Sequence, residues 1–262
     1  MDWVIALLML TGMEIVLGID NIIFLSILVG ALPPKKQNVA RFVGLSLALA
    51  ARMGLLLSIR WVMGLEKALF HLSSFGFVPD AWLHSYQVDA ITGRDLVLIG
   101  GGLFLITKSV LEIHQKMEDL EDKEEAKGRR NPRVAGSLLI AIPQIVLLDL
   151  VFSLDSIISA LGMVKEVWIM IVAMSIAVAL MAFFSAKVSR FIESHATFKM
   201  LALGFLVLIG IVLIADGFGT RIPRGYIYVS MLFAVSVELL NMRRRSKRDA
   251  KARRALPRTV RA

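Results

Sequence analysis

The sequence predicts an all-α, polytopic membrane protein of one domain with about seven transmembrane helices. Of the 262 residues, 57% are hydrophobic and only 19% are charged, and the mean hydropathy is +0.72. A soluble domain of this length is far less apolar. The apolar residues also gather in seven stretches, each long enough to cross the ~30 Å hydrocarbon core of a bilayer as a helix of about 20 residues.

The seven predicted spans differ in length and in the charge of their flanks. The first begins Met-Asp-Trp without the basic residues of a signal peptide and is too long for a signal sequence, so we expect it to be retained. Most of the 30 Lys and Arg residues fall in the connections of one side, with a dense cluster after Met242. The positive-inside rule therefore predicts an outer amino terminus and a cytoplasmic carboxyl terminus. In order, the spans are 3–30, 39–63, 95–113, 135–163, 167–188, 199–218 and 225–242.

Three segments outside the spans are long enough to have a character of their own. For the outer connection, 64–94, we expect a short interfacial helix and see no catalytic group. The connection 114–134 has mixed charge and is expected to extend the third span as a solvated helix before breaking at Gly128 and Pro132. The basic tail, 243–262, is expected to be cytoplasmic and disordered. This tail contributes much of the net charge of +9, which points to the membrane surface and not to nucleic acid.

The transmembrane domain, 1–242, is predicted to contain two related halves. Repeat one covers 1–113, the cytoplasmic linker 114–134, repeat two 135–218 and an extra helix 225–242. Because each half has three spans, the second half starts from the opposite side of the membrane. Inverted-topology repeats of this kind build many transporters, with the binding site at the repeat interface near the bilayer midplane.

An acidic motif in the first span recurs in the fourth. Residues 14–23 read Glu-Ile-Val-Leu-Gly-Ile-Asp-Asn-Ile-Ile, and residues 149–158 read Asp-Leu-Val-Phe-Ser-Leu-Asp-Ser-Ile-Ile. In both copies an acid is followed six residues later by Asp, then by a small polar residue and Ile-Ile. A carboxylate in the hydrocarbon costs at least ~2.5 kcal/mol, so it normally faces a partner or a water-filled cavity and serves a function.

The repeated motif supplies a set of oxygen ligands. The chain has no Cys, and carboxylate, amide and hydroxyl oxygens suit Mn²⁺, Mg²⁺ or Ca²⁺. On a straight helix, residues six apart point ~120° apart. We therefore expect both helices to bend or unwind, near Gly18 and Ser153, so that the acids can converge. The candidate metal ligands are Glu14, Asp20, Asn21, Asp149, Asp155 and Ser156.

Five further polar residues in the spans are secondary candidates. Gln144 is a candidate cavity-lining ligand. Lys108 and Glu112 are four residues apart, a stabilising spacing; they either take part in transport, or Lys108 simply extends towards the cytoplasm. His114 either senses protons or is an ordinary solvated histidine at a helix end. Arg52 requires an acidic partner, and if it or Lys108 neutralises the repeated acids, the motif only holds helices together.

The sequence also resembles the TerC family of membrane proteins over nearly all of residues 1–242. The resemblance implies a seven-span protein related to the lysine-exporter and cation/Ca²⁺-exchanger superfamily, whose members are linked to Mn²⁺ efflux and to metal supply for exported enzymes. It places the family's acid pairs and their polar neighbours on the six candidate ligands above. The residues that carry it are 14–23, Leu32-Pro33 with Arg41 to Leu45, Gly102 to His114, 149–158 and Ile222 to Tyr228.

The acids and the resemblance together predict a transporter that exports divalent cations, Mn²⁺ above all, by alternating access at the paired carboxylates. The alternative is a non-transporting membrane assembly or tellurite-resistance factor that acts through protein partners. No enzyme signature is present, so an intramembrane metal-dependent hydrolase is a distant third reading. We expect a bacterial-type inner membrane location, no cofactor besides the transported ion and no nucleic-acid partner, and leave a homo-oligomer open.

Overall fold

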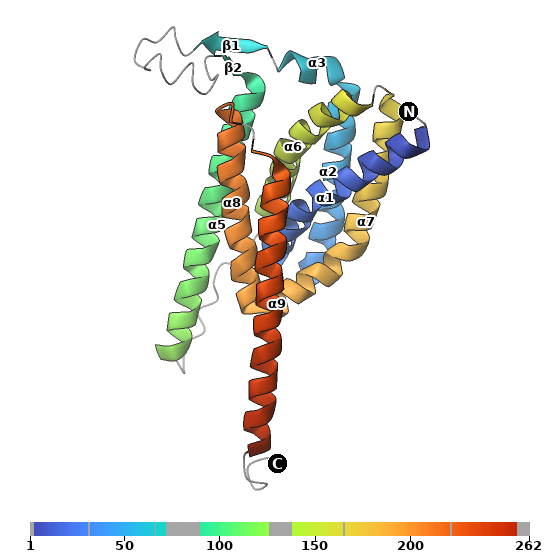
Figure 1. Ribbon diagram of the computed structural model, residues 1–262. Coiled ribbons are helices and arrows are strands. Elements are labelled where there is room, and N and C mark those ends of the chain that lie inside the picture. Colours follow the sequence, from blue (N-terminus) through green and yellow to red (C-terminus); the bar gives the residue numbers. More distant parts are fainter. Residues whose placement is uncertain are drawn as a thin grey trace. The chain divides into compact units, whose positions relative to one another are not determined.

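Among the residues that the computed structural model describes, seven helices are long and apolar enough to cross a membrane, as the sequence predicts. The structure describes residues 3–30, 32–65, 67–71, 90–125, 138–164, 166–220 and 222–255, without the side chains of 19, 34, 59–61, 119–125, 155, 159 and 245–255. The seven helices are α1 (Trp3–Gly30), α2 (Pro34–Leu57), α5 (Gly93–Glu125), α6 (Leu138–Met163), α7 (Val167–Ser194), α8 (Ala196–Gly217) and α9 (Arg224–Ala255) (Figure 1).

The connection between α2 and α5 contains three short elements. These are α3 (Ile59–Gly64) and the antiparallel strands β1 (Ala68–His71) and β2 (Ala90–Thr92). The expected interfacial helix would fall partly on 72–89, which lie outside the described residues. Helix α5 begins at a capping arrangement, because the Asp95 amide donates to Thr92 Oγ1 at 3.2 Å while the Thr92 amide donates to Asp95 Oδ2 at 2.9 Å.

Helices α1 and α7 pack side by side and run in the same direction. Trp3 lies beside Trp168, with ring centroids 6.1 Å apart, at one end of the pair. Just past the middle of α1, a Cβ at Gly18 would lie 2.5 Å from the sulfur of Met181. Helices α2 and α6 are paired in parallel in the same manner.

Helices α5 and α8 form a second, antiparallel pair whose backbones approach closely (Figure 1). A Cβ at Gly102 would lie 2.6 Å from the carbonyl oxygen of Gly210, and a Cβ at Gly210 would lie 2.6 Å from Cγ1 of Ile106. Small residues permit such approaches between membrane helices. Gly102 and Gly210 therefore serve packing of α5 against α8.

The predicted unwinding of the acid-bearing helices is wrong. Helix α1 is continuous through Gly18, and α6 is continuous through Ser153 and includes Pro143 in its first turns. Gly18 admits the Met181 side chain, and the Ser153 hydroxyl donates to the carbonyl of Asp149 one turn earlier, inside an intact helix.

Two charged segments continue the helices of apolar spans. Helix α5 continues to Glu125, in line with the expected extension of the third span, while 126–137 lie outside the described residues. Helix α9 continues to Ala255, so disorder from residue 243 is the wrong prediction for the backbone of 243–255. Lys, Arg and Ala have high helix propensity and simply propagate the helix of the span.

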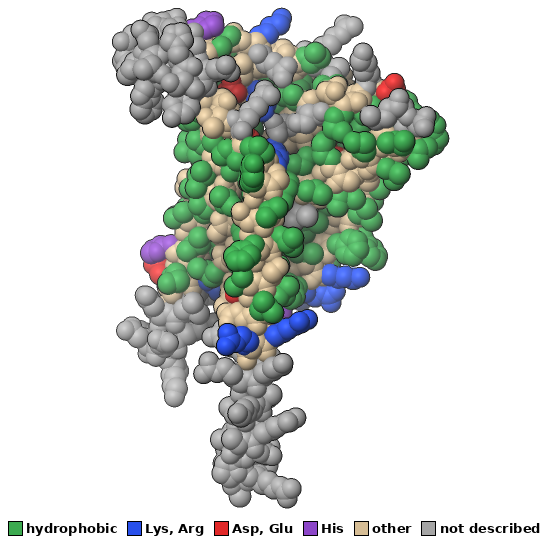
Figure 2. All heavy atoms as spheres, in the orientation of Figure 1, with side chains coloured by type: hydrophobic (Ala, Val, Ile, Leu, Met, Phe, Trp, Pro, Cys, Tyr) green, Lys and Arg blue, Asp and Glu red, His purple; other side chains and the backbone are tan. Residues whose placement is uncertain are grey.

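The chain divides into two compact units, 1–221 and 222–262, and the apolar helices of both expose large side chains. In the first unit, Phe42 is 75% exposed and Leu139 86% exposed; in the second, Tyr226 is 72% exposed. Hydrophobic side chains cover most of the helical surface in view in Figure 2. Such faces fit contact with lipid. The core of the first unit contains Leu10, Leu98, Leu105, Leu148, Leu154 and Ile157.

Candidate functional site

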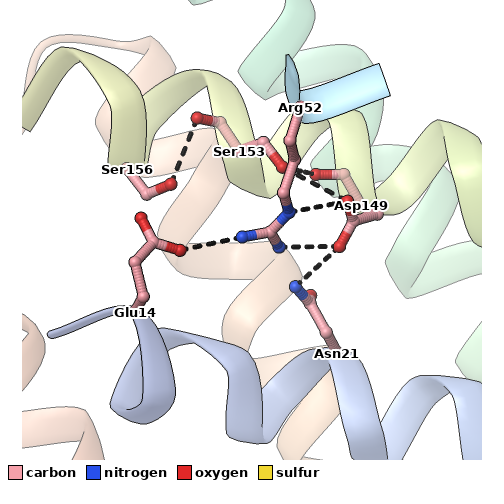
Figure 3. Close-up of polar contacts among 6 residues, drawn as sticks. All are labelled: Glu14, Asn21, Arg52, Asp149, Ser153 and Ser156. Carbon is pink, nitrogen blue, oxygen red and sulfur yellow. Dashed lines mark hydrogen bonds and ion pairs between the residues drawn. The ribbon is translucent and has the colours of Figure 1, made fainter. Parts of the chain in front are cut away.

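A buried arginine joins the first acids of the two motif copies (Figure 3). Arg52, on α2, donates from Nη1 to Glu14 Oε2 at 2.8 Å. It donates two hydrogen bonds to Asp149, from Nε to Oδ2 at 2.9 Å and from Nη2 to Oδ1 at 2.7 Å. Glu14 is 0% exposed, Arg52 2% and Asp149 8%. Helices α1, α2 and α6 thus meet at one cluster of buried charge.

Helical periodicity explains why these side chains share one face. Glu14 and Asn21 are seven residues apart on α1, and Asp149 and Ser156 are seven apart on α6. Seven residues of α-helix complete almost two turns, so each pair points in nearly one direction. Ser153, one turn from Asp149, lies on the same face of α6 and also donates to Asp149 Oδ2 at 3.3 Å.

The polar faces of α1 and α6 contact each other. Asn21 Nδ2 donates to Asp149 Oδ1 at 3.0 Å. At the other end of the cluster, the free oxygen of Glu14 faces the hydroxyl of Ser156, which donates to the carbonyl of Ser153 at 3.2 Å (Figure 3). Each acid is therefore placed opposite the small polar residue of the other motif copy.

The cluster keeps excess negative charge and unfilled acceptor oxygens. One guanidinium faces two carboxylates, and a third buried acid, Asp20, is 6% exposed on α1 beside Asn21. Among the described side chains, Glu14 Oε1 and Asn21 Oδ1 are buried and accept no hydrogen bond. Oxygen atoms of this kind are ligands for hard divalent cations.

The second acids of the two motif copies are Asp20 and Asp155. Asp20 is one residue, or about 100° of helix, away from Asn21, so it lies on a different side of α1. The side chain of Asp155 lies outside the described residues. Within the described part of the chain, no three His, Asp or Glu side chains are grouped closely enough to hold a metal ion.

The secondary candidates are only partly connected to this cluster. Arg52 has the acidic partners that the sequence predicts. Glu112 pairs with Lys199 of α8 at 3.4 Å. The ion pair crosses to a neighbouring helix because α5 and α8 pack closely there. His114 is an exposed residue that faces Glu118 at 3.2 Å, and Gln144 is half-buried on α6.

Ser153 and Arg41 are buried polar residues that are absent from the sequence-based candidates. Ser153 contacts both the carboxylate and the carbonyl of Asp149, and its i+4 spacing from that acid is the signal that identifies it. Arg41, 8% exposed near the start of α2, donates to Ser189 at 2.8 Å and Asn38 at 3.1 Å. It joins α2 to α7 about three helical turns from Arg52.

Seven apolar helices and an ionisable cluster buried between three of them define a multi-pass membrane protein with a polar site inside its bundle. The family model of the integral membrane protein TerC family matches residues 1–252. The chain belongs to the TerC family.

Curated relatives share close to half of their aligned residues with this chain. It is 45% identical over 243 residues to the UPF0053 inner membrane protein YgdQ of Escherichia coli K12, covering 93% of this chain and 94% of YgdQ. A UPF0053 protein of Haemophilus influenzae is 44% identical over 241 residues, covering 92% and 94%. The UPF0053 inner membrane protein YoaE of E. coli K12 is 42% identical over 236 residues; the match covers 90% of this chain but only 42% of YoaE. No solved structure matches.

Proposed function

We propose that the chain is a transporter that exports divalent cations, with Mn²⁺ as the favoured substrate, across the inner membrane. The observation that carries this proposal is the convergence of Glu14 and Asp149, from the two motif copies, at one buried site between apolar helices. Ionisable groups at that depth are costly and typically mark an ion pathway. The names of YgdQ and YoaE support the choice of membrane, and the distribution of Lys and Arg supports an outer amino terminus.

The packing of the helices supports two inverted repeats. If α1, α2 and α5 correspond to α6, α7 and α8, exchanging the halves turns the α1–α7 pair into the α6–α2 pair, and both pairs are parallel. The same exchange turns the contact of Asn21 with Asp149 into the approach of Ser156 to Glu14. A quasi-symmetric site between two halves fits alternating access by rocking of one half against the other.

The chemistry of the cluster favours a cation of the Mn²⁺ type. Carboxylates from Glu14, Asp20, Asp149 and Asp155, with the Asn21 amide and the Ser156 hydroxyl, form an all-oxygen ligand set in this proposal. Such ligands suit Mg²⁺, Ca²⁺ and Mn²⁺ and lack the thiolates that softer metals prefer. Net negative charge repels anions and lowers the free energy of a bound cation.

Flux measurements test this function directly. Purified protein in liposomes should transport Mn²⁺, and Asp20→Asn and Asp155→Asn should abolish the flux because each removes a carboxylate from the ligand set. Glu166→Gln, which neutralises an exposed acid outside the cluster, is the matched control and should transport normally. Full transport by both Asn variants would contradict the proposal.

A second candidate function is a non-transporting assembly or tellurite-resistance factor. The observation that favours it is that Arg52 binds both first acids, as a purely structural ion pair would. This function predicts that a deletion strain is complemented by Asp20→Asn and Asp155→Asn but not by variants of the basic tail or the cytoplasmic linker. The transporter predicts the opposite pattern. Neither function requires a catalytic group.

A further inference from the structure

We propose that Arg52 is an internal cation that occupies the acid pair in the ion-free protein and competes with the transported ion for it. This inference rests on the proposed transport function and assigns to Arg52 the role of a residue that sets affinity and permits return of the empty carrier. It begins from the three hydrogen bonds that the guanidinium donates to Glu14 and Asp149, at 2.7–2.9 Å.

The guanidinium uses most of the oxygen atoms that a cation would need. Both oxygens of Asp149 and Oε2 of Glu14 bind Arg52, which leaves Glu14 Oε1 as the carboxylate oxygen of this pair without a donor among the described residues. A divalent ion coordinated by both carboxylates would meet a full positive charge at the same oxygens. In a low-dielectric interior such repulsion is strong, so ion binding requires the guanidinium to withdraw.

The formal charges show what the arginine contributes to a transport cycle. Counting Glu14 and Asp149 alone, the two carboxylates carry one net negative charge with Arg52 bound between them and none with a divalent ion bound in its place, while the withdrawn guanidinium keeps its own charge. Without either cation they carry two negative charges within the membrane, and moving such a site between the two faces is costly. After the ion is released, the ion-free site has to turn back towards the other side of the membrane. Arg52 neutralises part of its charge and so permits this step, and net export then needs no second ion.

The bonding geometry accounts for arginine at this position. A guanidinium is planar and presents its donors as a fork, so it can bind Asp149 with two bonds and reach Glu14 with a third. A lysine ammonium is a compact point charge. Replacement by lysine would keep a charge near the acids but weaken its hold on the pair.

The test separates binding, net flux and exchange. Mn²⁺ alone is titrated against wild type and Arg52→Gln, and the liposome flux is measured with Mn²⁺ on one side or on both. We expect Arg52→Gln to bind Mn²⁺ at least about tenfold more tightly, within the usual range of coupling between two ligands. Net flux should fall at least about tenfold, while exchange of Mn²⁺ for Mn²⁺ continues, because only the empty carrier is trapped.

Arg41→Gln is the matched control. It removes a buried arginine from the same helix whose described bonds go to Ser189 and Asn38, so Mn²⁺ affinity and the ratio of exchange to net flux should stay within about twofold of wild type. Arg52→Gln that binds no more tightly than wild type, or that loses exchange together with net flux while folded, would overturn the inference.

A second variant decides the question if Arg52→Gln does not fold. Arg52→Lys retains the charge and should bind Mn²⁺ about three- to tenfold more tightly than wild type, because its single ammonium competes less well for two carboxylates. An unchanged affinity of Arg52→Lys for Mn²⁺ would contradict the inference about Arg52 but would not contradict the proposed transport function. Wild type that neither binds nor transports Mn²⁺ would remove the transport function, and this inference with it.

Discussion

The unequal bonding of the two acids predicts unequal losses of stability. The Asp149 carboxylate accepts two bonds from Arg52 and one each from Asn21 and Ser153, whereas Glu14 accepts one from Arg52. Asp149→Asn therefore removes the bidentate ion pair with Arg52 and leaves Glu14 as the one carboxylate bound to Arg52 in this pair. Glu14→Gln leaves the stronger pair intact and removes the excess negative charge.

The magnitudes follow from these contacts. Breaking a buried ion pair from one side costs about 3–5 kcal/mol, so we expect Asp149→Asn to lower the free energy of unfolding by about that amount. Loss of one hydrogen bond to a charged group costs about 1.5–3 kcal/mol, which is the expectation for Glu14→Gln. Glu166→Gln, an exposed acid, should change stability by less than about 0.5 kcal/mol.

Unfolding in mixed micelles, followed by the fluorescence of the four Trp residues, measures all three variants against wild type. The expected order of destabilisation is Asp149→Asn, then Glu14→Gln, then Glu166→Gln. Equal losses for the first two variants, or a larger loss for Glu14→Gln, would refute the assignment of Asp149 as the main anchor of Arg52.

Two further predictions concern regions away from the acid cluster. Gly210→Ala should destabilise the protein by about 1–3 kcal/mol, because its new Cβ would lie 2.6 Å from Ile106 Cγ1 and 2.9 Å from the carbonyl oxygen of Gly102. Gly204→Ala, on the same helix with no atom within 4 Å of the new Cβ, is the matched control and should be neutral or up to about 1 kcal/mol more stable in the same unfolding assay. Truncation after Arg244 should leave Mn²⁺ flux in liposomes unchanged, because the acid cluster lies entirely on α1, α2 and α6; loss of flux would instead assign the basic tail to transport.

The fold could be predicted because hydropathy and charge are local properties of the chain. Seven apolar stretches and the extension of α5 into a charged helix follow from composition along one segment at a time. The partner of Glu112 could not be predicted in this way. Lys199 lies 87 residues further along the chain, and only the packing of α5 against α8 brings the two side chains together.

Only part of the candidate site could be predicted from the sequence in the same way. A repeated acid in an apolar helix needs a partner, and Arg52 was a candidate on that ground alone. The six-residue spacing of the acids predicts divergent side chains, and the unwinding expected from it does not occur in α1 or α6. The seven-residue spacing of Glu14 and Asn21 predicts the face that the continuous helix presents, and Arg52 then joins this face to the one on α6.

The location of bound Mn²⁺ is the most direct test of the account. Anomalous scattering from Mn²⁺-loaded crystals identifies the metal without any assumption about transport. We predict a peak between α1 and α6, within about 2.0–2.6 Å of carboxylate oxygens of Glu14 and Asp149, with the Arg52 guanidinium displaced from both acids. Mn²⁺ found only at exposed acids, with both Arg52 ion pairs intact at saturating metal, would contradict the central claim.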